Sequence, residues 1–256
     1  MEAAAVDHLI ATWPPPPAGP ALQLLSIDGA MVPLVGGCWT EAKLLAVGTV
    51  TARPDAAGVL HPHTADLSYV ARVADADHFS RHLTGETHRR GTATAGQVAA
   101  VMDGAVWLQG VVDRHRPDAV RILDFPHAVA HLSIPAALVW GAESPALTCW
   151  REQVVHHLRH GDPADVLAAV ATLPATTAAA QAAVRSALDY RCIRWEQIQY
   201  ATFAAQGFPL GSGSVEGGHK VVMQARLKGS GMHWALANVN PLLALRCAAS
   251  NHRWPE

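Results

Sequence analysis

The sequence predicts an α/β fold with a mixed sheet, because three strand-like segments come first and helix-like and strand-like segments alternate after them. The first three segments, at about 22–28, 41–50 and 66–73, are apolar or alternating runs separated by turn signals, which is typical of consecutive hairpins. Short apolar runs at 98–104 and 119–125 follow, each after a helix-like segment, as in βαβ units. Helices are therefore expected on both faces of the sheet.

The remaining segments have the spacing and capping residues of helices. Asp75 is a suitable N-cap for a helix at 76–90, and Asp162 precedes Pro163 at the expected first position of another. The chain from about 140 to 200 is rich in alanine and poor in strand signals, which predicts a helical insertion. Further helices are expected at 105–115, from 127 onward, after the Gly/Ser-rich turn in 207–220, and at 238–249.

This order of elements is that of the ribonuclease H-like fold, in which the first and fourth strands lie side by side. We expect one such domain over residues 22–250, with the helical insertion at about 140–200. Residues 1–21 contain the proline run 14–17 and are expected to form a stiff linker or a ragged end.

The composition excludes several classes of protein. Half of the 256 residues are hydrophobic and 16% are charged, which excludes a largely disordered chain. No apolar run is long enough to span a membrane and no secretory signal is present, so a cytoplasmic location is expected. With a net charge of −2, the chain lacks the excess of basic residues that is typical of a self-sufficient DNA-binding protein. The cysteines include no CxxC pair, which excludes a zinc ribbon.

Three acids stand where predicted strands stop: Asp28, Asp103 and Asp124. Each has an ordinary explanation, because Asp is common in turns. The expected sheet nevertheless brings Asp28 and Asp103 together from distant parts of the chain, and adjacent carboxylates repel unless a cation neutralises them. Such oxygen ligands suit Mg²⁺ or Mn²⁺, and two such ions can clamp the attacking and leaving oxygens of a phosphodiester.

Glu216 is the best candidate for a third carboxylate, because it lies at the start of the helix after a Gly/Ser turn, where the helix N-terminus is expected to face the acids. A Glu in the first helical turn is also favoured by the helix dipole alone. Ser212 or Ser214 equally suits an ordinary N-cap.

Five ordered blocks, covering most of residues 22–250, resemble the catalytic part of the ISKra-type insertion-sequence transposases, a DDE family. The blocks are LSIDGAMVPL (25–34), THRRGTATAGQVAAVMDGAVWLQG (87–110), HRPDAVRILDFPHAVAHL (115–132), GFPLGSGSVEGGHK (207–220) and ARLKGSGMHWALANVNPLLALR (225–246). The resemblance implies a bacterial protein with a ribonuclease H-like core and a helical insertion before the last acid. It also implies two Mg²⁺ or Mn²⁺ ions, cleavage of transposon ends, strand transfer into target DNA, and a homodimer in the active complex.

The resemblance assigns the first catalytic and metal-binding Asp to Asp28 and the Glu to Glu216. Asp103 is the preferred second acid, and Asp124 is the alternative; in the preferred triad, Asp124 and His127 lie at the rim of the site. The chain departs from the family pattern after Glu216, where Gly217, Gly218 and His219 stand. Members are usually longer, so this chain is expected to be an N-terminally truncated catalytic part.

Basic and aromatic residues follow Glu216 closely and are candidates for binding the phosphate backbone and a base of DNA. The alternative is an ordinary solvated helix face with a Trp buried beneath it. These residues are Lys220, Arg226, Lys228, His233 and Trp234. Two other functions also stay open from the sequence, namely another ribonuclease H-like nuclease and a catalytically inactive transposase remnant.

Overall fold

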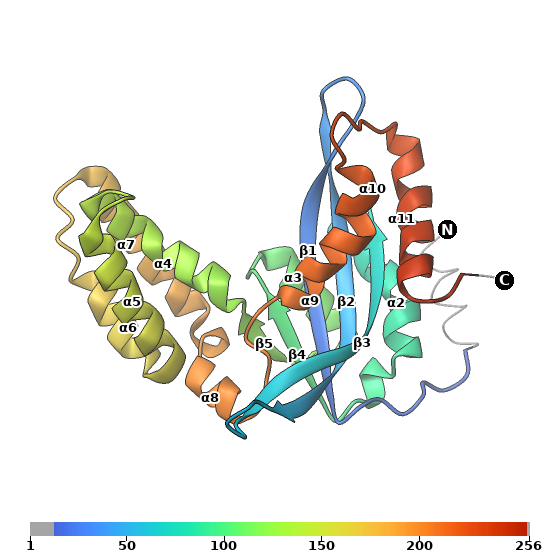
Figure 1. The fold of residues 1–256 in the computed structure, drawn as a ribbon, viewed down its shortest axis with the longest axis horizontal. Helices are drawn as coiled ribbons and strands as arrows, with labels where there is room; N and C mark the ends of the chain where they lie inside the picture. Colours follow the sequence, from blue (N-terminus) through green and yellow to red (C-terminus); the bar gives the residue numbers. More distant parts are fainter. Residues whose placement is uncertain (1–12, 255–256) are drawn as a thin grey trace.

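The computed structural model describes residues 13–254, apart from the side chains of residues 191 and 192, and its core is a five-stranded mixed sheet (Figure 1). The strands lie in the order β3-β2-β1-β4-β5. The predicted α/β class and the side-by-side position of the first and fourth strands are confirmed. The strands are β1 (Leu22–Pro33), β2 (Trp39–Pro54) and β3 (Leu60–Arg72), which pair antiparallel, and β4 (Gln97–Met102) and β5 (Val120–Leu123), which run parallel to β1.

The first three strands are longer than the sequence predicts. β1 continues five residues beyond Asp28, and its pairing with β2 extends to Pro33 opposite Trp39. This distal part of the hairpin contains Gly, Met and Pro and has exposed positions, so it has neither the continuous apolar run nor the alternation from which strands are recognised. Gly36 and Gly37, both with positive φ, turn the chain at its tip.

Helices cover both faces of the sheet, as predicted. α2 (Ala76–Arg89) and α3 (Val106–His115) pack on the face formed by odd-numbered β1 residues such as Ile27. The opposite face is covered by α9, α11 and the helical block described below. The C-terminal elements are α9 (Gly213–Gly218), the π-helical turn η3 (His219–Gln224), α10 (Ala225–Leu227) and α11 (Leu236–Ser250).

Only helices and turns occur between residues 125 and 205, which confirms the strand-poor character predicted for the middle of the chain. We call α4 to α8 the helical block; it stands to one side of the sheet (Figure 1). Its apolar core is continuous with residues of β1, β4 and β5. Its helices are α4 (Phe125–Trp140), α5 (Pro145–His160), α6 (Pro163–Ala171), α7 (Ala178–Ile193) and α8 (Tyr200–Ala205).

Local capping follows the sequence closely. The Asp75 carboxylate accepts a hydrogen bond from the His78 backbone N–H, and Asp162 caps α6, which Pro163 begins. No helix of the described part of the chain is long and apolar enough to cross a membrane. Before β1, Gly19 donates from its backbone N–H to the Thr94 hydroxyl (2.9 Å), so the end of the proline-rich segment is attached to the domain.

α11 protects the free edge of β3 with two asparagine side chains. The Tyr69 N–H donates to Asn251 Oδ1 (2.7 Å), and Asn251 Nδ2 donates to the Tyr69 carbonyl (2.9 Å). Asn240 makes the same pair of bonds with Val73 (2.8 and 3.1 Å). The amide groups thereby replace a neighbouring strand at an edge that would otherwise be open to pairing with another chain.

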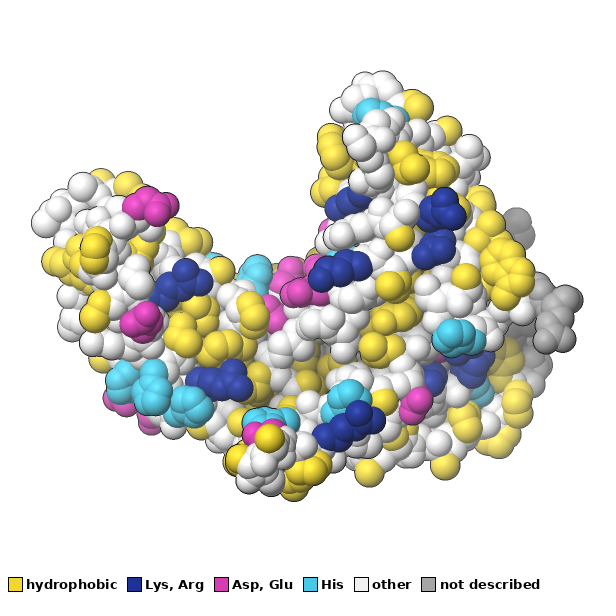
Figure 2. All heavy atoms as spheres, in the orientation of Figure 1, with side chains coloured by type: hydrophobic (Ala, Val, Ile, Leu, Met, Phe, Trp, Pro, Cys, Tyr) yellow, Lys and Arg dark blue, Asp and Glu magenta, His cyan; other side chains and the backbone are white. Residues whose placement is uncertain are grey.

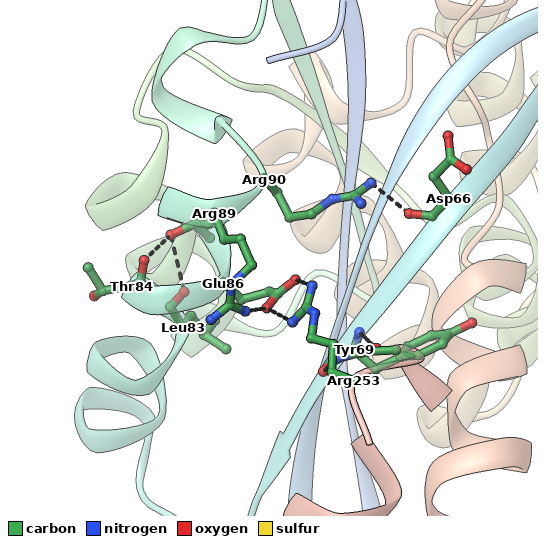
Figure 3. Close-up of polar contacts among 10 residues, drawn as sticks. Asp66, Tyr69, Leu83, Thr84, Glu86, Arg89, Arg90 and Arg253 are labelled. Atoms are coloured by element: carbon green, nitrogen blue, oxygen red, sulfur yellow. Dashed lines mark hydrogen bonds and ion pairs between the residues drawn. The ribbon is translucent and has the colours of Figure 1, made fainter. Parts of the chain in front are cut away.

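A buried carboxylate joins α2 to the chain after α11 (Figure 3). Glu86 accepts two hydrogen bonds from the Arg253 guanidinium, at 2.6 and 2.8 Å, and one from Arg89 at 2.5 Å. Burial alone would raise the pKa of Glu86, but the bonds and charge of Arg253, with the charge of Arg89, outweigh it and hold the pKa below its usual range. The C-terminal end of the domain is therefore tied to the opposite layer.

Replacing Arg253 by Met is expected to lower the free energy of unfolding by about 2–3 kcal/mol at pH 7, because a buried carboxylate loses its bidentate partner. Since the folded-state pKa of Glu86 is lowered, its ionised form contributes stability above the unfolded pKa of about 4.5, and this is lost as the pH falls through the folded-state value. Urea unfolding at pH 7 and pH 4 should show that the difference between wild type and variant shrinks at the lower pH. A difference that is equal at both values would contradict the assignment.

Candidate functional site

Three acids lie along the same edge of the sheet, where the pairing of the parallel strands ends. Ile27 of β1 is in register with Met102 of β4, so Asp28 and Asp103 are the next residues on neighbouring strands. Asp124 comes directly after β5, on the other side of β4. The predicted juxtaposition of Asp28 and Asp103 is a consequence of this register.

Asp28 is half-buried and carries the most perturbed carboxylate of this edge. Burial is the largest cause that raises its pKa, and the Gly29 N–H lowers it; with the smaller effects of Asp103 and Glu216, which raise it, and His127, which lowers it, the pKa rises from 3.8 to about 6. The structure therefore brings Asp28, Asp103 and Glu216 close enough for their charges to interact.

Asp103 and Glu216 each have a local hydrogen bond as well. Asp103 Oδ1 accepts from the Ala105 N–H (2.9 Å) at the turn into α3, which is the turn role weighed as its ordinary explanation. Glu216 is exposed, and its Oε1 accepts from the Ser212 hydroxyl (3.1 Å). Ser212 is the N-cap residue of α9, although its side chain bonds to Glu216 rather than to a backbone N–H.

Asp124 has a different environment from the other acids. Its side chain is buried, Oδ2 accepts from the His127 N–H (2.9 Å), and Oδ1 accepts from the Ser212 N–H (2.7 Å). Both oxygens are thus engaged by backbone groups, and the carboxylate links the start of α4 to the turn before α9. This arrangement favours Asp103 over Asp124 as the second acid, with Asp124 supporting the segment that carries Glu216.

His219 lies against Asp28 and did not figure among the predicted site residues. Its ring is buried, and Nδ1 is 3.6 Å from Asp28 Oδ2. Burial and the charge of Lys228 lower the pKa of His219, opposed by Glu216 and by the Asp28 backbone, so the ring is neutral at pH 7. The only sequence signal was its departure from the family pattern, and its position opens a π-helical turn, a feature often found at functional sites.

The two glycines after Glu216 differ in how closely the rest of the protein approaches them. A Cβ at Gly218 would lie 2.7 Å from the Tyr69 ring and 2.8 Å from Leu44 Cδ2, so α9 can approach the sheet only with glycine there. A Cβ at Gly217 would meet nothing within 4 Å. The close approach at Gly218 sets the distance between the Glu216-bearing helix and the sheet.

The predicted DNA-binding residues fall into two groups. Lys220, Arg226 and Lys228 are exposed on η3, on α10 and directly after it. Trp234 is half-buried against the cluster beneath α11, and its backbone bonds to Pro33, so its ring has the packing role weighed as the alternative. His233, beside it, is exposed.

We call the five-stranded sheet, with the helices that pack on it outside the helical block, the sheet domain. The molecular surface is hollowed between the helical block and this sheet domain (Figure 2). Acidic side chains gather at the floor of this hollow, with Lys or Arg and His side chains beside them. α9, which carries Glu216, borders the same region (Figure 1). The hollow beside α9 is therefore open to a ligand on this face of the molecule.

The donor chemistry of the three acids fits a hard divalent cation. Carboxylate oxygens are the ligands that Mg²⁺ and Mn²⁺ prefer, and a cation would remove the repulsion that raises the pKa of Asp28. As the side chains lie, no three His, Cys, Asp or Glu among the described residues are arranged to hold a metal ion. The Glu216 carboxylate is instead bonded to the Ser212 hydroxyl.

Replacing Asp28 by Asn is expected to stabilise the metal-free protein by about 1–2 kcal/mol at pH 7.5, allowing for partial solvent screening. The folded-state pKa of about 6 exceeds the unfolded value of 3.8, so ionisation of Asp28 costs stability as the pH rises through this interval, and the cost is complete above pH 6. Thermal unfolding in EDTA at pH 5 and pH 7.5 should show a larger gain at pH 7.5. The exposed acid Glu143, replaced by Gln, is the control and should show no such gain.

Comparison with protein-family models gave no match for this chain. Comparison with curated proteins gave no significant match either. The resemblance to ISKra-type transposases stays a prediction from the sequence.

Proposed function

We propose that this chain is the catalytic domain of a DDE transposase of the ISKra type, which cleaves transposon ends and joins them to target DNA. The observation that carries the proposal is the position of Asp28 and Asp103 on neighbouring strands at one edge of a sheet ordered β3-β2-β1-β4-β5, with Glu216 near enough for its charge to affect Asp28. A ribonuclease H-like domain would have this strand order, and the helical block lies between β5 and the helix that carries Glu216, where the family is expected to have its insertion.

In the proposed chemistry the three acids act together as metal ligands. Asp28, Asp103 and Glu216 would hold two Mg²⁺ or Mn²⁺ ions, which activate the attacking oxygen and stabilise the leaving oxygen when bound. In cleavage, water attacks a phosphodiester and its oxygen joins phosphorus, while the bond from phosphorus to the strand's 3′-oxygen breaks. The attacking water gives a proton to solvent, and the 3′-oxygen takes up a proton from solvent to become a 3′-hydroxyl. In strand transfer, that 3′-hydroxyl attacks a target phosphodiester and a target 3′-oxygen leaves.

DNA is the proposed partner, entering the hollow between the helical block and the sheet domain. The exposed cations Lys220, Arg226 and Lys228 lie within 12 residues after Glu216 and would contact phosphates beside the acids. A net charge of −2 makes long-range attraction of DNA weak, so binding would depend on this local group and on a second copy in a proposed homodimer.

The proposal is tested by nicking of a supercoiled plasmid that carries the DNA flanking this gene, with Mg²⁺ or Mn²⁺ present. We expect metal-dependent nicking by the wild type, loss of nicking on Asp28→Asn, and no loss on Glu143→Gln. Products that join the ends to new target DNA support transposition, whereas nicking without joining would point to another ribonuclease H-like nuclease. No metal-dependent nicking under any of these conditions would indicate an inactive remnant and overturn the proposal.

A further inference from the structure

The loop that carries Asp103 is held by the end of α7, a helix remote from it in the sequence. The Tyr190 hydroxyl donates to the Asp103 carbonyl (3.0 Å), and the Arg194 guanidinium donates to the Gly104 carbonyl. Tyr190 belongs to α7 and Arg194 follows this helix directly, whereas both acceptors belong to the turn between β4 and α3. Two successive carbonyls next to an acid of the candidate site are thus bonded by one remote segment.

The contact is close and specific. Gly104 has a φ of +86°, and a Cβ there would lie 2.3 Å from the Tyr190 hydroxyl, so glycine serves both the turn and the approach of the tyrosine. The Tyr190 ring stacks on His131 of α4, with centroids 4.3 Å apart and an interplanar angle of 22°, which directs its hydroxyl. Arg194 is 8% exposed, and a buried guanidinium needs such a hydrogen bond.

We infer that Tyr190 and Arg194 are positioning residues, through which the helical block holds the Asp103 turn beside Asp28. The geometry of this contact stands by itself, while its consequence for catalysis rests on the proposed function. The insertion then has a task besides shaping the hollow, because the end of α7 bonds to the turn that carries the second acid. Tyr190 does not touch the reacting atoms and acts through Asp103.

The chain offers a matched control for Tyr190. The Tyr200 hydroxyl donates to the Leu123 carbonyl (2.8 Å) at the end of β5, the next strand of the sheet. Tyr190→Phe and Tyr200→Phe therefore each remove one tyrosine hydroxyl from a strand-end carbonyl. Only the first removes a bond from the turn that carries Asp103.

The test compares these two variants by amide hydrogen exchange of Ala105, whose N–H is bonded to Asp103 Oδ1, and by the affinity for Mn²⁺ alone. We expect Tyr190→Phe to speed exchange at Ala105 about fivefold and to weaken Mn²⁺ binding about fivefold, the effect of one lost hydrogen bond. Tyr200→Phe should change neither quantity by more than about twofold, and thermal unfolding will show that both variants are folded.

Unchanged exchange at Ala105 in Tyr190→Phe, or an equal change in both variants, would overturn the inference. Faster exchange in Tyr190→Phe alone supports the inference, even where the wild type binds no Mn²⁺. A wild type that binds no Mn²⁺ would instead count against the proposed function. Arg194→Met provides a second variant, for which the same local increase in exchange is expected.

Discussion

Replacing Glu216 by Gln is expected to reduce metal-dependent DNA nicking by about a thousandfold or more, because it removes a negative ligand that cleavage needs throughout the reaction. Glu216 is well suited to this experiment, since its side chain is exposed and bonds within its own helix end to Ser212. The variant should therefore keep the unfolding temperature of the wild type. Initial nicking rates in Mg²⁺ give the measurement.

Ser212→Ala is the matched control for Glu216→Gln. It removes the hydroxyl that donates to Glu216 but keeps the backbone N–H that donates to Asp124, so the turn before α9 is preserved. We expect nicking within about threefold of the wild type, as for loss of one exposed hydrogen bond. Nicking by Glu216→Gln at the rate of Ser212→Ala would show that Glu216 is not a metal ligand.

Replacing Gly218 by Ala is expected to give the second largest effect, on both stability and activity. The new methyl group would lie 2.7 Å from the Tyr69 ring and 2.8 Å from Leu44, both in the packed face of the sheet. Overpacking of this kind costs about 1–3 kcal/mol, and the helix that carries Glu216 must move outward to relieve it. A displacement of about 1 Å at a catalytic group lowers the rate about a hundredfold. Urea unfolding and nicking rates measure the two effects.

Gly217→Ala provides the comparison, because the same methyl group one residue earlier would meet nothing within 4 Å. Alanine is also the better helix former, so we expect this variant to be more stable than the wild type by about 0.5–1 kcal/mol and to keep its activity. Equal effects of the two substitutions would contradict a close approach at Gly218. The contrast would also explain why a pair of glycines follows the acid.

The fold could be predicted from the order of apolar and alternating segments, because each buried strand leaves a local pattern. The side-by-side position of Asp28 and Asp103 followed from the expected strand order and is present in the register of Ile27 with Met102. The outer parts of the first three strands were missed, since hairpin pairing there depends on the neighbouring strand more than on local pattern.

Residues that act through tertiary contacts left no comparable signal. Tyr190 and Arg194 occur in an alanine-rich helical stretch, and nothing in their neighbourhood indicates the turn that they contact. Asp124 has the same sequence setting as Asp103, an acid after an apolar strand, and its burial and two backbone donors are seen only in the structure. His219 was visible as a departure from the family pattern, but its burial against Asp28 required the packing of α9 on the sheet.

The most direct measurement is the number of Mn²⁺ ions bound per chain in the wild type and in Asp28→Asn. Electron paramagnetic resonance at pH 7.5 measures this number. It needs neither the transposon ends nor any further segment of DNA-binding protein. We expect two ions in the wild type and binding weakened about a hundredfold or more in the variant, through loss of a shared charged ligand. Equal binding by both proteins, or none by the wild type, would contradict a metal centre at Asp28, Asp103 and Glu216.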